Sequence, residues 1–147
     1  MDLSQLNANI PVDLLNASMQ NSLISNLGIQ IEAVSEGEVV ATMPVSEKTM
    51  RPGGILHGGA NLALAETIAG LGSILLIDSA EYDARGIQVS ANHVGGAKEG
   101  QVVATAKIIH RGKQTHIWNV DITRQDGKLI SSARVTNMII KKDDQGR

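Results

Sequence analysis

The stretch GGILHGGANLALAETIAGLGSILLI, residues 53–77, decides the fold, because it has the character of a buried helix and carries one charged side chain, Glu66. A lone carboxylate loses its hydration in such a helix, so it is retained there when it is paired or has a chemical role. We therefore expect Glu66 to be a buried catalytic group. The alternative is a glutamate on the surface of the helix, facing water.

The neighbours of Glu66 on the same helical face are small. Ala63, Ala69, Gly70 and Ser73 lie three, four and seven positions away, which places them on one face of an α-helix. Small side chains leave room beside the carboxylate for a ligand or for a second helix.

The hydrophobic periodicity of the whole chain predicts an α+β fold, with one antiparallel sheet against one buried helix. The single domain spans residues 1–147, with an N-terminal helical segment at 1–27 and a frayed, disordered tail at 141–147. Asp126-Gly127 is typical of the tight turn of a hairpin. We expect helices at 12–26 and 58–77, and strands at 29–34, 38–44, 86–97, 101–110, 115–124 and 128–140.

Composition excludes several classes of function. A formal net charge of −2 with scattered basic residues argues against nucleic-acid binding, and the absence of cysteine excludes thiolate catalysis. The four dispersed histidines predict no metal site. The N-terminus does not resemble a signal peptide, so the expected compartment is the cytoplasm. Polar residues within 55–77 favour a buried helix over a membrane span.

The segment from His57 to Glu66, His-Gly-Gly-Ala-Asn-Leu-Ala-Leu-Ala-Glu, is followed by Val-Ser-Ala-Asn-His-Val at 89–94. Together these segments resemble the hotdog-fold acyl-CoA thioesterases. The similar branch includes 4-hydroxybenzoyl-CoA thioesterases of the Arthrobacter type, 1,4-dihydroxy-2-naphthoyl-CoA thioesterases and thioesterases of phenylacetate degradation. The resemblance covers residues 28–140. It implies a curved sheet around a central helix, and hydrolysis of an aromatic or medium-chain acyl-CoA.

The resemblance also implies roles for three residues. The backbone amide of Gly58 polarises the thioester carbonyl, His57 lies beside it, and Glu66 is the nucleophile or general base. The residues alone support this reading, since two glycines at a helix start expose N–H groups where the helix dipole favours negative charge. A tight turn into the helix is the alternative explanation of the Gly-Gly pair. No cofactor is expected, because coenzyme A is part of the substrate.

The spacing of Gly58 and Glu66 bears on assembly. Eight residues of helix span about 12 Å, whereas a reacting carbonyl needs each group within about 3 Å. Two antiparallel helices related by a twofold axis bring Gly58 of one subunit near Glu66 of the other. The resemblance likewise implies a homodimer, assembled further as a dimer of dimers.

Further residues are candidates for substrate binding. The loop with Arg111 and Lys113 suits the phosphates of CoA, or is a solvated turn. His93 lines the acyl pocket by resemblance, or is a surface residue. The full set of candidates is Arg51, Gly59, Asn61, Gly70, Asn92, His93, Arg111 and Lys113.

The chain departs from the family pattern at two of these positions. Arg51 replaces a glutamine seven residues before the oxyanion glycine, and Gly70 replaces a serine or threonine four residues after the acid. Thr67 or Ser73 is a possible replacement for the missing hydroxyl, and Arg51 suits an anionic acyl group or CoA. The alternative functions are an acyl-thioester dehydratase or hydratase, and a non-catalytic acyl-CoA-binding protein.

Overall fold

The computed structural model describes residues 7–144. Its order of elements is the predicted one: a helical segment, two strands, a long helix and four strands. The elements are α1 (Val12–Ser18), α2 (Leu23–Asn26), β1 (Gln30–Ser35), β2 (Glu38–Pro44), β3 (Met50–Arg51), β4 (Ile55–Leu56), α3 (Gly58–Ile74), β5 (Tyr82–His93), β6 (Gln101–Arg111), β7 (Thr115–Arg124), β8 (Leu129–Lys141) and the 3-10 turn Lys142–Asp144.

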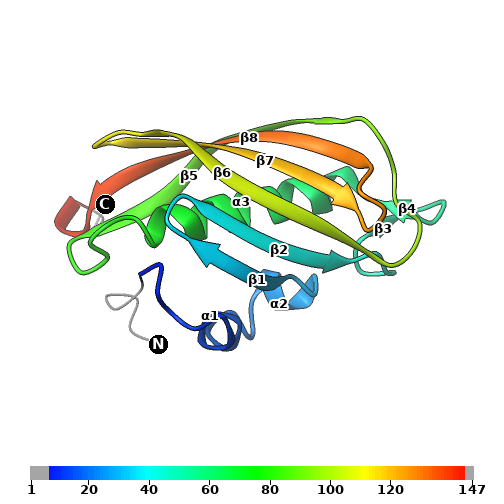
Figure 1. The fold of residues 1–147 in the computed structure, drawn as a ribbon, viewed down its shortest axis with the longest axis horizontal. Helices are drawn as coiled ribbons and strands as arrows, with labels where there is room; N and C mark the ends of the chain where they lie inside the picture. The colour runs from blue at the N-terminus through cyan, green and yellow to red at the C-terminus, as the bar shows by residue number, and fades with distance from the viewer. Residues whose placement is uncertain (1–6, 145–147) are drawn as a thin grey trace.

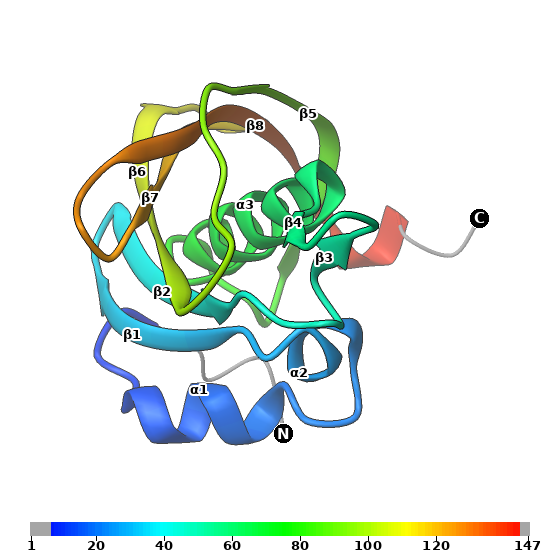
Figure 2. The ribbon, with the colours of Figure 1, turned by 90° about the vertical axis from the view of Figure 1, so that its right-hand side faces the viewer.

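Six strands form one antiparallel sheet in the order β1-β2-β6-β7-β8-β5, which curves around α3. Figure 2 looks along α3 and shows the strands passing around it, with α1 and α2 on the far side of β1. In Figure 1 the N-terminal end of α3 lies beside β3 and β4, and its C-terminal end lies near the start of β5. The α+β prediction is confirmed, and the arrangement is that of a hotdog fold.

The core forms where the concave face of the sheet meets α3. Along β7 alternate residues are buried, including Trp118, Val120 and Ile122, because successive strand residues point to opposite faces. Trp118 packs against Gly72 of α3, where a Cβ atom would be only 2.7 Å from the ring atom Cζ2. Only glycine lets helix and sheet approach this closely.

The N-terminal segment differs from the single helix expected at 12–26. Asn21 has a φ of 58°, in the left-handed region, which interrupts the helix. Asn16 of α1 instead binds the free edge of β1, since its side chain accepts a bond from Ile31 N–H (2.8 Å) and donates one to Ile31 C=O (3.0 Å). A polar side chain thus satisfies backbone groups of an edge strand, which are otherwise open to pairing.

Two other segments differ from prediction. The expected loop before α3 contains the short hairpin β3–β4, in which Met50 pairs with Leu56. At the C-terminus, Lys141 pairs with Tyr82 as the last residue of β8, and a 3-10 turn follows. Regular structure therefore continues to residue 144, whereas a frayed tail was expected from 141. Residues 1–6 and 145–147 lie outside the described part of the chain.

Strand β5 is unlike the other long strands. It forms one edge of the sheet, and most of its residues are exposed on both faces. Ile87 and Val94 are 55% and 61% exposed. Within residues 7–144, no helix is long and apolar enough to cross a membrane.

Candidate active site

The N-terminus of α3 presents one free backbone donor. His57 is the N-cap residue, and its Nδ1 accepts a hydrogen bond from Gly59 N–H at 2.8 Å. The N–H groups of Ala60 and Asn61 bond to the carbonyl of His57. Within residues 7–144 the Gly58 N–H has no acceptor, as expected for the first residue of a helix. The cap thus engages the Gly59 amide and leaves the Gly58 amide without an acceptor in the described chain.

The imidazole of His93 packs against Gly58. A Cβ atom on Gly58 would lie 2.9 Å from both Cδ2 and Nε2 of that ring. Nδ1 of His93 is 2.9 Å from Oγ of Ser131, which faces it across the β5–β8 pair. The alternation expected for 89–94 correctly placed His93 on the face opposite Asn92. A side chain at Gly58 would therefore require the His93 ring to move.

Glu66 was expected to be buried, but its side chain is exposed in the single chain. It lies on the flank of α3 that faces β5. Its Oε1 lies against Gly86, where a Cβ atom would be 2.5 Å away. The prediction of a carboxylate buried within one chain was wrong, because small residues on both α3 and β5 leave this flank open. Glu66 and Gly58 are eight residues apart on the helix, about 12 Å by helix geometry.

The two hydroxyls considered as replacements for the one missing at Gly70 are both engaged elsewhere. Thr67 Oγ1 donates to Ala63 C=O at 2.7 Å. Ser73 Oγ is fully buried on the sheet side of α3. A Cβ atom at Gly70 would meet nothing within 4 Å. The position that lacks the hydroxyl is therefore open space in the single chain.

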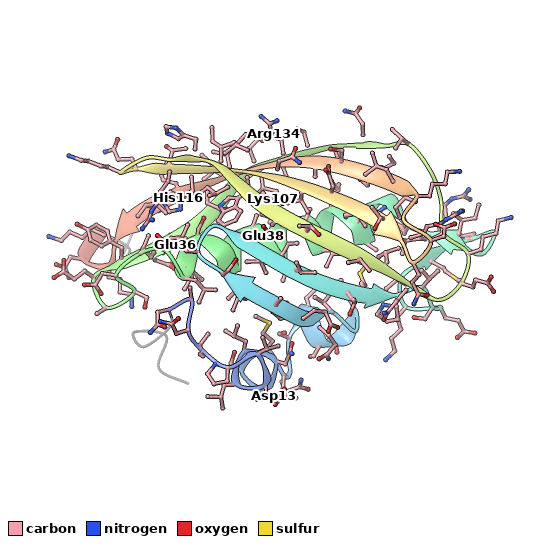
Figure 3. All side chains as sticks on the ribbon, viewed as in Figure 1. Asp13, Glu36, Glu38, Lys107, His116 and Arg134 are labelled. Atoms are coloured by element: carbon pink, nitrogen blue, oxygen red, sulfur yellow. The ribbon has the colours of Figure 1, made fainter. Side chains whose placement is uncertain are left out.

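The C-terminal half of α3 carries a buried polar cluster. Ser73 Oγ accepts hydrogen bonds from Trp118 Nε1 (2.8 Å) and Asn137 Nδ2 (2.9 Å). With both lone pairs occupied, its own proton is available for His116 Nδ1, 3.1 Å away. Burial lowers the pKa of His116, and the nearby charges of Arg111 and His110 lower it further. Figure 3 places His116 near Glu36, at the end of the molecule away from β3 and β4.

The remaining candidates are dispersed. Arg51 is exposed on β3 and donates to the carbonyl of Pro52 at 2.9 Å. Asn92 is exposed on β5. Asn61 is buried, and its Oδ1 has no partner within the described residues. Arg111 binds Glu36 (2.9 Å) and the carbonyl of Leu76 (2.8 Å), just beyond the C-terminal end of α3.

Arg111 and Lys113 are thus at the opposite end of α3 from Gly58 within one chain. The structure brings together His57, Gly58, Gly59 and His93, and leaves Glu66 a little over two helical turns away. Sequence reasoning missed Ser131, because the residue opposite His93 is known only once the strand register is known.

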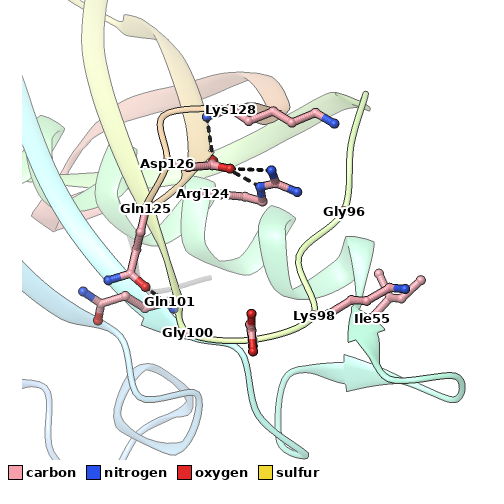
Figure 4. A pocket seen from close by; sticks show the side chains of 10 residues that line it. Ile55, Gly96, Lys98, Gly100, Gln101, Arg124, Gln125, Asp126 and Lys128 are labelled. Carbon is pink, nitrogen blue, oxygen red and sulfur yellow. Dashed lines mark hydrogen bonds and ion pairs between the residues drawn. The ribbon is translucent and has the colours of Figure 1, made fainter.

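Three hollows adjoin α3 or the segment before it. A cavity of about 340 Å³ lies beside His57 and Gly59, and one of about 330 Å³ is lined by Met19, Thr67, Gly70 and Ile74 among others. Figure 4 shows the largest, about 840 Å³, between the 96–101 loop and the β7–β8 hairpin. It contains Lys98 and Lys128 with Glu99 and the Arg124–Asp126 ion pair, in which Arg124 lowers the Asp126 pKa to about 2.

The hollow in Figure 4 is connected to the active-site segment. Leu56 N–H bonds to the carbonyl of Ala97 at 2.9 Å, and Gly96 packs on Ile55. These contacts hold the loop next to the strand that leads into His57. No sequence pattern indicated this hollow, because its walls come from segments that are far apart in the chain. Across residues 7–144, no group of three or more acidic, histidine or cysteine side chains is placed to hold a metal ion.

Comparison with known proteins gives a consistent result. Residues 53–131 match the model of the thioesterase superfamily. The chain is 35% identical to 1,4-dihydroxy-2-naphthoyl-CoA hydrolase of Escherichia coli, over 89% of this chain and 96% of that one. A thioesterase crystal structure from Haemophilus influenzae superposes with a TM-score of 0.90 at 35% identity, covering 97% and 99% of the two chains. A Streptococcus pneumoniae hypothetical thioesterase solved with coenzyme A gives 0.73 at 29% identity, covering 80% and 91%.

Proposed function

The chain belongs to the thioesterase superfamily, and from this premise we propose that it hydrolyses an acyl-CoA thioester to the free acid and CoA. The observation that supports the proposal most strongly is the different hydrogen bonding of the two glycine amides at the start of α3. His57 occupies the amide of Gly59, and the Gly58 amide is left without an acceptor in the described chain. A free N–H at a helix N-terminus suits a carbonyl oxygen on which negative charge develops.

The reaction needs a water molecule and a base. Water adds to the carbonyl carbon, the C–S bond breaks, and the CoA thiolate leaves and takes up a proton. Glu66 supplies the base or attacks the carbon itself, giving an anhydride that water then hydrolyses. The chemistry proposed requires no metal ion and no cofactor beyond the CoA of the substrate.

The acid and the donor of one site come from two chains in this proposal. Glu66 is about 12 Å along α3 from Gly58. The exposed flank of α3, with Glu66 and Gly70, lies next to the free edge of β5. An antiparallel partner helix on this flank places Glu66 of the partner subunit near Gly58, and it covers the carboxylate that is exposed in the single chain. A homodimer, and a dimer of dimers beyond it, is the proposed assembly.

The proposed place of the acyl group is the apolar hollow beside α3 of the chain that supplies Glu66, rather than a charged site. The cavity of about 330 Å³ is lined mostly by apolar residues and includes Met19, Gly70 and Ile74, which suits an aromatic or medium-chain acyl group. Arg51 faces its own turn at Pro52, so contact with an anionic acyl group requires that it swing away. For the CoA phosphates, the proposed contacts are Arg111 and Lys113 of a partner chain, with Lys98 and Lys128 as further cations.

The test is release of free thiol from a panel of aromatic and aliphatic acyl-CoAs, by the natural chain and by Glu66→Gln. We expect hydrolysis by the natural chain and a loss of at least about 10²-fold in kcat for the variant. Because glutamine is nearly isosteric with glutamate, Glu66→Gln should remain folded, with an unfolding free energy that is unchanged or slightly raised where the partner helix covers the carboxylate.

The matched control is Glu81→Gln, another exposed glutamate, which should retain full activity. Hydrolysis by Glu66→Gln within a few-fold of the natural chain would remove Glu66 from the mechanism.

A further inference from the structure

We propose that His93 is a second catalytic hydrogen-bond donor, acting with the Gly58 amide on the carbonyl oxygen of the thioester. The inference rests on the proposed function and adds a residue to its site. It starts from the position of the ring, whose Nε2 and Cδ2 atoms occupy the space of the missing Gly58 side chain. A group bound at the Gly58 amide is thus within reach of an imidazole nitrogen.

The hydrogen-bonding of Ser131 determines which nitrogen of His93 carries the proton. Ser131 is fully buried, and within residues 7–144 its Oγ makes one side-chain hydrogen bond, to His93 Nδ1. If Nδ1 donated this bond, the hydroxyl proton would be buried without an acceptor, at a cost of about 1–3 kcal/mol. Ser131 therefore donates, Nδ1 accepts, and the ring proton is on Nε2.

The Nε2–H group is available to a substrate. His93 is exposed in the single chain, and no hydrogen bond from Nε2 occurs within the described residues. The backbone around the ring is held by the pairing of His93 with Ser131 in the β5–β8 ladder. A donor fixed in this way needs little reorganisation as charge develops on the oxygen.

The hydrogen bond requires no transfer of the proton, which remains on Nε2 throughout the addition of water. An imidazolium also carries Nε2–H, so protonation of the ring preserves the donor. This property separates a donor from a general base, which would lose its function when it is protonated.

The experiment compares His93→Ala, His93→Gln and the control Arg134→Ala in steady-state hydrolysis of one acyl-CoA. Arg134 is an exposed residue of β8, three positions from Ser131, and belongs to none of the proposed contacts. We expect kcat of His93→Ala to fall by about 10–10²-fold with KM changed less than about threefold, because a transition-state donor is removed. Glutamine carries an N–H near the place of Nε2, so His93→Gln should recover kcat to within about fivefold of the natural chain.

Two further readouts exclude a merely structural role. The pH–rate profile of His93→Gln should have the shape of the natural profile, because neither side chain acts as a base. Ser131→Ala should lower kcat, and Ser131→Thr, which keeps the hydroxyl, should recover it. Thermal unfolding of every variant verifies that each is folded.

The inference is overturned if folded His93→Ala keeps kcat within about twofold, or if His93→Gln is no better than His93→Ala. These outcomes are distinct from failure of the proposed function. That function fails if the natural chain releases no thiol from any acyl-CoA of the panel, or if Glu66→Gln keeps its activity. With hydrolysis present and dependent on Glu66, inert His93 variants reject the His93 donor alone.

Discussion

The two ends of α3 are built from similar parts with opposite outcomes. Near each end a glycine of the helix lies under a ring from the sheet: Gly58 under His93, and Gly72 under Trp118. Each end also has a serine–histidine pair, Ser131 with His93 and Ser73 with His116. At the C-terminal end every lone pair of the serine hydroxyl is used and the histidine is 2% exposed. At the N-terminal end, the amide of Gly58 and Nε2 of His93 have no hydrogen-bond partner among the described residues.

The difference teaches what separates a structural polar cluster from a reactive one. Ser73 joins His116, Trp118 and Asn137 in a buried network that links the helix to β7 and β8. In the His93–Ser131 pair one ring nitrogen bonds to the protein, and the other has no partner within residues 7–144. A serine–histidine pair alone therefore does not indicate a reactive site. The more informative feature is the number of hydrogen-bond donors in the cluster that have no partner in the protein.

The largest expected effect on stability comes from replacing Gly72 of α3 with alanine, and the same replacement at Gly70 is the comparison. Gly72→Ala places a methyl group against the Trp118 ring, whereas Gly70→Ala meets open space in the single chain. We expect Gly72→Ala to lower the free energy of unfolding by about 1–3 kcal/mol through overpacking. Gly70→Ala should lower it less than Gly72→Ala does, since alanine favours a helix and the new methyl group meets no atom of its own chain. Urea unfolding measures both, and equal shifts in one direction would contradict the packing described.

The next expected effect is the pH dependence of stability from His116. Burial, Arg111 and His110 lower its pKa in the folded chain. Below about pH 6.5 the His116 ring binds a proton in the unfolded chain and stays neutral in the folded chain. The free energy of unfolding therefore falls as pH falls, by at most about 1.4 kcal/mol per pH unit. At pH well above 6.5 this contribution is constant.

The matched variant is His116→Asn, which keeps an acceptor for Ser73 and cannot titrate. Its unfolding free energy, measured from pH 5 to 8, should have a shallower slope below pH 6.5 than that of the natural chain. Parallel slopes would mean that His116 is not held neutral in the folded chain.

Much of the fold was predictable from local patterns. The bounds of β2 and β7 coincide with the expected strands, since alternation and turn residues mark them clearly. The break in the N-terminal helical segment was not predictable. The amphipathic pattern continues across residues 12–26, and it does not reveal that Asn21 adopts a left-handed backbone conformation. Hairpin β3–β4 has two residues per strand, too few for an alternating pattern.

The site was predictable where it depends on one continuous segment. His57, Gly58 and Glu66 lie on α3 or at its start, and their relative spacing follows from the helix alone. The prediction that Glu66 is buried was wrong, because a helix with small residues on one flank is covered only in part by its own chain. The association of Ser131 with His93 depends on the register of two strands 38 residues apart, which no local signal provides.

The central claim is that Gly58 and Glu66 of one site belong to different chains, and mixed dimers test it most directly. Glu66→Ala and Gly58→Ala are each expected to be inactive, the latter because a Cβ atom displaces His93. Unfolded together and refolded, the two variants should form heterodimers in which one of the two sites combines an intact Gly58 with an intact Glu66. Thiol release from acyl-CoA should then reach about half the natural rate per purified heterodimer. Verified heterodimers that remain inactive would contradict a site shared between chains.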